Sequence, residues 1–444
     1  MSVRNRVLAC LTLLLLVAQV WAADAVVVKV VTDRPDAMYH CSEQARFLVS
    51  VTRDGAPVTS GNFDWVLSLD GGSTRFGTGS GQLGLAPAEV VGTLEQPGIL
   101  RCAVTYRGGE KPVTVLGGAA FDPEKIKPTA TEPADFDKFW QRNKEKLAKT
   151  PMDAKLTEKP ELSNDRMKVY KINLANLRGS RVYGWLAVPT LQGPHPSILT
   201  IPGAGVSAIG ASWATSWASR GFTAMTVTVH DYDVDLPAAT YEVLKQGQLR
   251  NYQLQGRLDR NSYYYLRVCL GSVRAIDYLT SRSDWDGKNM IVTGSSQGGG
   301  MSIITAGLDQ RVTAIAANVP ALCDHPGKLF GRPSGWPQLI PETTDAGYKK
   351  QITDTAAYYD AVNFARRVKC PAVVGVGLID TTCAATSVFS AYNSLQGPKH
   401  IMVYPLMGHA IDKGYSDYTG QWMTQQVFNA TSSFEIRRPG VPVE

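Results

Sequence analysis

The chain has 444 residues, of which 44% are hydrophobic and 19% are charged, as in an ordinary globular protein that can bury a sizeable core. At about 100–200 residues per domain, this length predicts two or three domains. Lys and Arg number 45 against 39 Asp and Glu, which gives a net charge of +6. So small an excess, spread along the chain without a basic run, argues against a nucleic-acid-binding protein.

The first 22 residues have the pattern of a secretory signal peptide. Arg4 and Arg6 precede an apolar stretch, residues 8–20, that is too short to span a membrane. Val20 and Ala22 place small residues where signal peptidase requires them, so we expect cleavage after Ala22. The sequence therefore predicts an exported protein, periplasmic or secreted. We expect no membrane span, because no later stretch of about 20 residues is apolar.

Residues 23–121 have an all-β pattern. Short apolar or β-branched runs at 26–31 and 47–51 are separated by turn clusters rich in Gly and Asp. This pattern predicts a small sandwich of immunoglobulin-like class. Export permits disulfides, and Cys41 with Cys102 is the candidate bridge of this domain, two free thiols being the alternative. Neither Cys-x-x-Cys nor a Cys/His cluster with zinc spacing occurs, so we expect no metal.

Residues 122–134 have the composition of a linker, and the pattern changes after them. Strands and helices then alternate through residues 135–444, which predicts one catalytic domain with a mostly parallel sheet covered on both faces. The expected strands are 197–201, 222–229, 289–293, 371–377 and 400–404; the expected helices are 135–149, 213–219, 263–281 and the segment after residue 297.

The strongest chemical signal is a Gly-x-Ser-x-Gly motif, Gly294-Ser295-Ser296-Gln297-Gly298, between an expected strand and an expected helix. A nucleophile on such a tight turn needs small neighbours, and the helix that follows offers free N–H groups and a positive dipole. The motif therefore predicts Ser296 as a catalytic nucleophile. The backbone N–H of Gln297 is then a candidate oxyanion donor.

A nucleophilic serine needs a base and an orienting acid, in the order Ser, acid, His for this fold. His409 lies in a loop after the last expected strand and is the predicted base, with His325 as the alternative. Asp380 follows the preceding strand and is the predicted acid. Its competitor Asp360 has an alternative structural role, which is to cap the helix that contains residues 363 and 364.

Two further sets of residues follow expected strands. The Gly-rich loop at 202–205 makes the Ala204 N–H the candidate second oxyanion donor. His230 and Asp231 follow the strand at 222–229, at the edge where substrate binds in open α/β sheets, and are candidate substrate-binding residues. A loop-capping pair is the alternative for these two.

Four segments, in order, resemble the acetyl xylan esterase / cephalosporin C deacetylase family. They are PADFDKFW at 133–140, VTGSSQGG at 292–299, YYDAVNFARRVKCP at 358–371 and GLIDTTC at 377–383. The resemblance implies an α/β-hydrolase that removes acetyl groups from xylan or related esters. It implies the roles of nucleophile, acid and base for Ser296, Asp380 and His409, and oxyanion donors at Gln297 and Ala204.

The chain departs from that family in three motifs. It has His230-Asp231 in the region of an Arg-Gly-Gln motif, Pro202-Gly203-Ala204 in place of His-Gly-Tyr, and His409-Ala410 in place of His-Glu. We therefore expect a divergent serine esterase with an extra N-terminal β domain, acting without a cofactor on an acetylated oligosaccharide or another small ester. The alternatives are a serine hydrolase for another ester or a peptide, and a catalytically inactive carbohydrate-binding protein.

Overall fold

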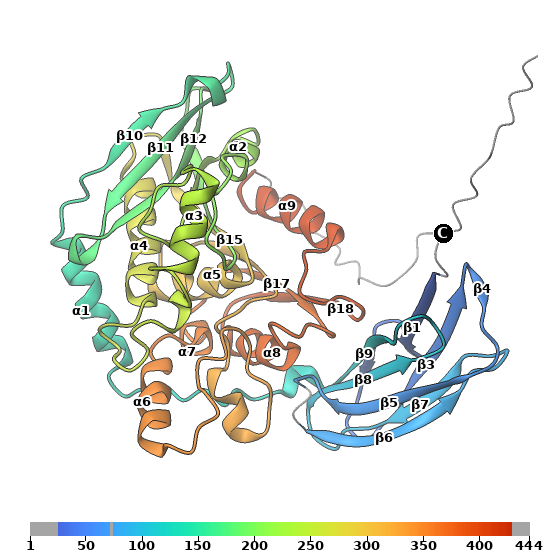
Figure 1. Cartoon of the computed structure of the whole chain (residues 1–444). Helices are drawn as coiled ribbons and strands as arrows, with labels where there is room; N and C mark the ends of the chain where they lie inside the picture. Colours follow the sequence, from blue (N-terminus) through green and yellow to red (C-terminus); the bar gives the residue numbers. More distant parts are fainter. Residues whose placement is uncertain (1–24, 72–73, 429–444) are drawn as a thin grey trace, which may run out of the picture.

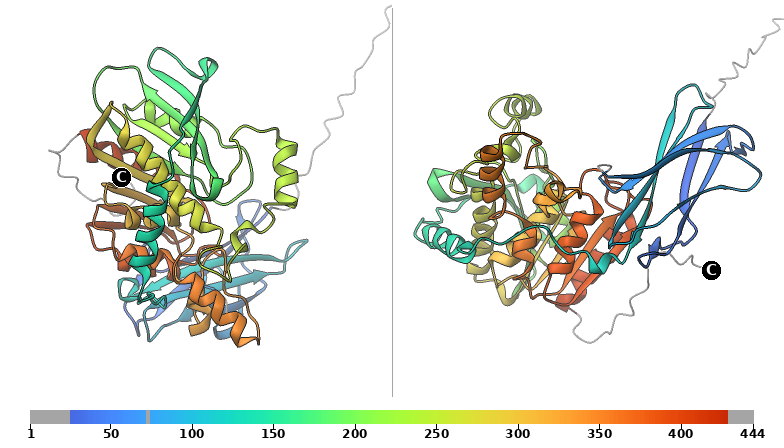
Figure 2. Two further views of the ribbon diagram at one scale, coloured as in Figure 1. Left: turned by 90° about the vertical axis from the view of Figure 1, so that its left-hand side faces the viewer. Right: turned by 90° about the horizontal axis from the view of Figure 1, so that it is seen from below.

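The computed structural model describes residues 25–71 and 74–428; the expected signal peptide lies outside them. The N-terminal strands form two sheets, and the rest of the chain forms a larger body of one sheet with helices (Figure 1). The N-terminal sheets lie beside the end of the large sheet, near β17 and β18, in all views (Figures 1 and 2). Within the described ranges, no helix has the length and apolar character needed to cross a bilayer.

The two N-terminal sheets enclose one hydrophobic core. Phe47 and Val49 from one sheet and Leu100 and Val104 from the other are fully buried in it. Inward side chains alternate with outward ones, as expected for strands with one buried face. One sheet contains β1 (Val26–Thr32), β3 (Ala45–Arg53), β4 (Ala56–Pro57) and β7 (Ala88–Gly92). The other has the order β2 (Met38–Tyr39), β9 (Val113–Phe121), β8 (Gly98–Tyr106), β5 (Asn62–Leu69) and β6 (Arg75–Gln82).

The candidate disulfide is absent, because Cys41 and Cys102 are both free. Cys102 lies in the middle of β8, opposite Gly117. Cys41 lies beyond the end of β9, where its N–H donates to Asp122. Gly117 and Asp122 are five positions apart along this extended segment, about 16 Å at the usual rise. Two Cα atoms more than about 7 Å apart cannot be bridged without backbone movement.

The segment at 122–134, expected to be a linker, is bound to the larger body. It begins with the 3-10 turn η1 (Pro123–Lys125), and Ile126 and Ala130 are buried in the same core as the large sheet. The N–H groups of Thr129 and Ala130 both donate to the carboxylate of Asp324. The segment is therefore packed against the larger body.

The large sheet is mixed. Its five pairings from β14 to β18 are parallel, as the alternation of strands and helices predicts, and the three pairings from β10 to β14 are antiparallel. The order is β10 (Lys155–Glu158), β11 (Met167–Ala175), β12 (Arg181–Pro189), β14 (Thr223–Val227), β13 (His195–Ile201), β15 (Trp285–Ser295), β16 (Ala314–Asn318), β17 (Ala372–Gly377) and β18 (Lys399–Tyr404). All five expected strands are present.

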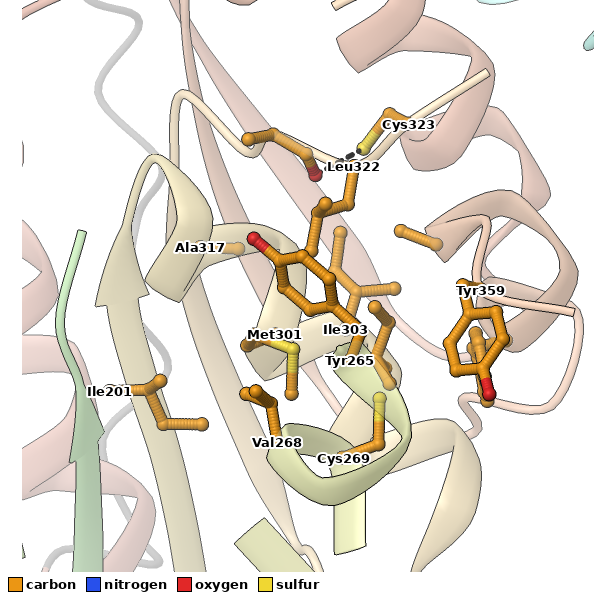
Figure 3. Packing of buried hydrophobic residues seen from close by; sticks show 14 of the residues in the cluster. Ile201, Tyr265, Val268, Cys269, Met301, Ile303, Ala317, Leu322, Cys323 and Tyr359 are labelled. Atoms are coloured by element: carbon orange, nitrogen blue, oxygen red, sulfur yellow. Dashed lines mark hydrogen bonds between the residues drawn. The ribbon is translucent and has the colours of Figure 1, made fainter. Parts of the chain in front are cut away.

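Helices cover both faces of this sheet. Neighbouring residues of β13, Ile198 and Leu199, belong to different buried clusters, because successive strand side chains point to opposite faces. One face carries α1 (Phe136–Ala148), α4 (Tyr265–Ser281), α5 (Gln297–Leu308), α6 (Ala346–Ala356), α7 (Ala361–Ala365) and α8 (Ala385–Ser394); the other carries α2 (Ser212–Ala218) and α9 (Lys413–Phe428). Figure 3 shows Val268 of α4 beside Met301 of α5 in the buried cluster.

The remaining short elements lie in the connections. They are α3 (Ala238–Gln246), η2 (Pro160–Leu162), η3 (Leu177–Gly179), η4 (Tyr252–Leu254) and η5 (His325–Phe330). Of these, α3 and η4 belong to the long excursion between β14 and α4. This excursion brings Tyr252 to the start of α5, where its OH donates to Gln297.

Candidate active site

Ser296 lies on a tight turn between β15 and α5. Its backbone φ of 58° and ψ of −121° is a conformation that non-glycine residues rarely adopt. A Cβ atom on Gly298 would lie 1.9 Å from the carbonyl oxygen of Ile201, and one on Gly294 would lie 2.5 Å from the same oxygen. Both glycines of the motif are thus required by the close approach of β13 to the turn.

The structure brings Ser296, His409 and Asp380 together in one hydrogen-bonded chain. His409 Nε2 lies 2.8 Å from Ser296 Oγ, and His409 Nδ1 lies 2.8 Å from Asp380 Oδ2. Asp380 follows β17 and His409 follows β18, so the carboxyl ends of neighbouring parallel strands supply both. The carboxylate accepts a hydrogen bond from the Nδ1–H group of His409. The lone pair of Nε2 is therefore free to accept the serine proton.

The acid is held from its own loop. Asp380 is fully buried, and its second oxygen, Oδ1, accepts from the N–H groups of Thr382 at 2.7 Å and Cys383 at 2.9 Å. These two bonds fix the plane of the carboxylate, so Oδ2 points at the imidazole. A carboxylate buried in this way needs such donors to offset its lost hydration.

The alternative base and acid lie elsewhere. His325 is buried in η5, and neither ring nitrogen has a hydrogen-bond partner. Asp360 is the N-cap of α7, where its side chain accepts from Val362 N, so the predicted capping role is confirmed. Burial raises the pKa of Asp360 to about 7, with the charge of Asp324 adding to the effect. Neither side chain makes a hydrogen bond to Ser296.

Sequence reasoning missed Asn318, the last residue of β16. Its Nδ2 donates to Ser295 Oγ and to the carbonyl oxygen of Ala410, both at 3.0 Å, and its own carbonyl oxygen accepts from Ser296 N at 2.9 Å. One buried amide therefore joins the nucleophile turn to the residue after His409. Its position at the end of a strand, next to the strand that carries the nucleophile, is the signal that could have identified it.

The two candidate oxyanion donors are Gln297, next to Ser296 in the chain, and Ala204, whose neighbour Gly203 lies near Ser296: a Cβ on Gly203 would lie 3.8 Å from Ser296 Cβ. Gln297 is the first residue of α5, and the first N–H groups of a helix have no intrahelical acceptor. Its buried side chain accepts from Tyr252 at 2.7 Å and Tyr265 at 2.6 Å, and donates to Gly203 O at 3.3 Å. Gln297 thus joins the nucleophile helix to the exposed loop that carries Ala204.

His230 is buried directly behind that loop. Its Nε2 donates to Gly205 O at 2.8 Å, and its Nδ1 accepts from Tyr264 OH at 2.6 Å, a neutral tautomer that satisfies both partners. Burial lowers the pKa of His230 to about 4, which favours the neutral ring. Asp231 accepts from Arg181 N and lines a pocket of about 400 Å³ with Tyr264. The bond to Gly205 O ties His230 to the loop that carries Ala204.

Asp380, Cys383 and His409 offer ligand atoms within 4.8 Å of one another, the only such group in the described part of the chain. His409 Nδ1 and Asp380 Oδ2 are already hydrogen-bonded to each other. Burial raises the pKa of the Cys383 thiol, and a metal ligand must be the thiolate. The hydrogen bond between His409 and Asp380 therefore occupies two of the three ligand atoms.

Comparison with known proteins gives a consistent assignment. The family model for acetyl xylan esterase (AXE1) matches residues 122–426. The acetyl esterase Axe7A of Xylanibacter ruminicola is 34% identical over 404 residues, which cover 89% of this chain and 90% of that protein. Since 89% of the chain exceeds the part after residue 121, the likeness to Axe7A includes part of the N-terminal sheets.

Solved structures resemble the larger body. The acetyl xylan esterase from Paenibacillus sp. R4 aligns with a TM-score of 0.59 and 27% identity, over 68% of this chain and 97% of its own. Acetyl xylan esterase 1 from Thermoanaerobacterium sp. JW/SL YS485 aligns with a TM-score of 0.58 and 22% identity, over 69% of this chain and 98% of its own. The likeness confirms the expected α/β-hydrolase fold of this part.

Proposed function

Because this chain belongs to the acetyl xylan esterase family and is an esterase, we propose that it removes acetyl groups from acetylated saccharides, of xylan type or related, by a Ser-His-Asp mechanism. One observation carries the mechanism. The chain of 2.8 Å hydrogen bonds from Ser296 through His409 to Asp380 begins on a strained strand-to-helix turn. This arrangement is the one that activates a serine for acyl transfer.

In the first half of the reaction, Ser296 Oγ attacks the ester carbonyl carbon. His409 Nε2 takes the Oγ proton, and the buried carboxylate of Asp380 stabilises the imidazolium that forms. The N–H groups of Gln297 and Ala204 donate to the oxyanion of the tetrahedral intermediate. The sugar alkoxide then leaves with the proton from His409, and acetyl-Ser296 remains.

In the second half, water attacks the acetyl-enzyme. His409 Nε2 accepts a proton from this water, and the same two N–H groups stabilise the second oxyanion. Collapse of the intermediate releases acetate, and the proton returns to Ser296 Oγ. The chain's own residues supply every proton transfer in this scheme.

The test measures hydrolysis of p-nitrophenyl acetate and release of acetate from acetylated xylo-oligosaccharides. We expect Ser296→Ala to lower kcat on both substrates by about 10⁴-fold or more, since the members of a triad act as a unit. Ser295→Ala is the matched control, because it removes the neighbouring hydroxyl, and we expect it to retain most of the rate. Equal losses in the two variants would contradict Ser296 as the nucleophile.

The substrates separate the alternatives. Acetate release from the oligosaccharide by the wild type supports the whole proposal. Turnover of the small ester alone would place the substrate among other esters, and cleavage of peptide amides would favour a peptidase. If neither ester is cleaved and a covalent serine probe leaves Ser296 unlabelled, the results would favour an inactive carbohydrate-binding protein.

We also propose that the protein is exported and that its N-terminal sheets are immunoglobulin-like. Export is supported by the pattern of residues 1–22, and N-terminal sequencing of the mature protein tests cleavage after Ala22. The strand orders β1-β3-β7 and β9-β8-β5-β6 match the A-B-E and G-F-C-C′ sheets of that fold. A crystal structure with other strand neighbours would contradict the second proposal.

A further inference from the structure

A buried arginine of the N-terminal sheets reaches the catalytic acid. Arg101, in the middle of β8, is only 6% exposed, and its Nη2 donates to the carbonyl oxygen of Asp380 at 3.0 Å. No other side-chain hydrogen bond of Arg101 is found within the described residues, and its Nε is buried without a partner. Burying a guanidinium group costs desolvation free energy. The stability of the fold alone is therefore a poor reason for an arginine at this position.

A second buried contact holds the other end of the same loop. Asp70 follows β5 and is fully buried; its Oδ2 accepts from Thr386 N at 2.7 Å and its Oδ1 accepts from Thr386 Oγ1 at 2.9 Å. Thr386 lies in the first turn of α8, where a carboxylate is favoured by the helix dipole. Burial raises the pKa of Asp70, and the positive charge of Arg101 opposes that rise.

β9, the strand next to β8, packs closely against the loop that carries Asp380. A Cβ atom on Gly118 of β9 would lie 2.7 Å from Leu378 Cβ and 3.0 Å from Leu378 O. Leu378 immediately follows β17 and precedes Asp380 by two residues. The preceding glycine, Gly117, faces the other way, and a Cβ there would lie 2.7 Å from Val30 Cγ1 inside the sandwich.

We propose that Arg101 and Asp70 are positioning residues for Asp380, and that the N-terminal sheets form a structural part of the catalytic site. The inference rests on the proposed triad. The residues from Asp380 to Thr386 include the two N–H donors that orient the carboxylate, at Thr382 and Cys383. The N-terminal sheets hold this loop at both ends, so a displaced sheet would turn Oδ2 away from His409.

The first test compares Arg101→Met, Arg101→Lys and the control Arg107→Met. Arg107 immediately follows β8 and is exposed, and its side chain forms an ion pair with exposed Asp64. We expect Arg101→Met to lower kcat by about 10²-fold, the usual effect of a misplaced catalytic group. KM should change little, because Arg101 does not contact the substrate. Lys can donate one bond to the same carbonyl and should restore part of the rate, whereas Arg107→Met should leave it unchanged.

A second readout needs no turnover. The proton between His409 Nδ1 and Asp380 should give a low-field NMR resonance in the wild type. We expect this resonance to weaken or shift in Arg101→Met and to persist in Arg107→Met. If this resonance and kcat are both unchanged in folded Arg101→Met, the proposal is overturned. An inactive wild type, or an active Ser296→Ala, would instead refute the proposed function, while the resonance would still report on the loop.

The two neighbouring glycines of β9 provide a test independent of Arg101. Gly118→Ala pushes the sheet away from Leu378, and Gly117→Ala disturbs only the interior of the sandwich. We expect Gly118→Ala to lose kcat and the low-field resonance, and Gly117→Ala to lower mainly the melting temperature. Equal losses of kcat in the two variants would show that only sandwich stability matters, and would overturn the proposal.

Discussion

Replacing His230 by Phe removes the support of the oxyanion loop while nearly conserving ring size. In the wild type, Nε2 donates to Gly205 O at 2.8 Å and Nδ1 accepts from Tyr264 OH at 2.6 Å. The phenyl ring makes neither bond. Gly205 O then loses this donor, and Tyr264 OH keeps only its 3.4 Å bond to Val229 O. The loop that carries Ala204 loses one of its two anchors, since the bond from Gln297 to Gly203 O remains.

The structure sets the size of both effects of His230→Phe. Each of the two lost hydrogen bonds contributes about 0.5–1.5 kcal/mol, so the free energy of unfolding should fall by about 1–3 kcal/mol. Loss of one oxyanion donor lowers kcat by about 10²–10³-fold. Because the loop is displaced and the Ala204 N–H is still present, we expect a loss of kcat near the lower end, about 10²-fold.

The assay is steady-state hydrolysis of p-nitrophenyl acetate together with urea unfolding. His230→Gln is the matched variant, because its terminal amide can still donate to Gly205 O and should recover much of kcat. If His230→Phe is less stable but keeps the wild-type kcat, then other contacts fix the loop. The assignment of Ala204 as an oxyanion donor through this support would then be refuted.

Three further results are expected. Gly298→Ala should give an inactive and strongly destabilised protein in activity and melting assays, since its Cβ would lie 1.9 Å from Ile201 O. Asn318→Ala should lower kcat about 10-fold at nearly constant KM, because the bond to Ala410 O near the catalytic base is lost. Burial lowers the pKa of His325 to about 4 against about 6.5 unfolded, so the unfolded state binds the proton first as pH falls. The contribution of His325 should be fully present above about pH 6.5 and fall by about 2 kcal/mol at pH 5 in urea titrations. A matched His325→Leu variant should therefore lose about 2 kcal/mol less than the wild type over this range, and the loss that remains includes the part due to His230.

The nucleophile turn could be predicted from sequence because its constraints are local. Gly294 and Gly298 lie on either side of Ser296 because no side chain fits at their positions. A stretch of five residues is therefore enough to identify the turn. The order of Ser296, Asp380 and His409 follows from a second general rule. Parallel strands place their carboxyl ends at one edge, so polar residues after successive strands meet there.

Side-chain roles that depend on long-range packing could not be predicted. His230 follows a strand at the catalytic edge, and only the fold turns its ring to Gly205 and Tyr264. The antiparallel strands β10 to β12 extend the sheet beyond the alternating pattern, since a strand's partner is not encoded in its own periodicity.

The sequence by itself therefore determined the proposed chemistry of this protein: the candidate nucleophile, its candidate acid and base, and a sheet able to bring them together. Tertiary structure alone decided what holds that chemistry in place. The contact of Arg101 with Asp380 joins residues 279 apart in the chain, and the separation of Cys41 from Cys102 depends on strand register. Turns and helix starts are set by neighbouring residues, whereas contacts between sheets depend on how whole faces pack, and that packing has no local signature.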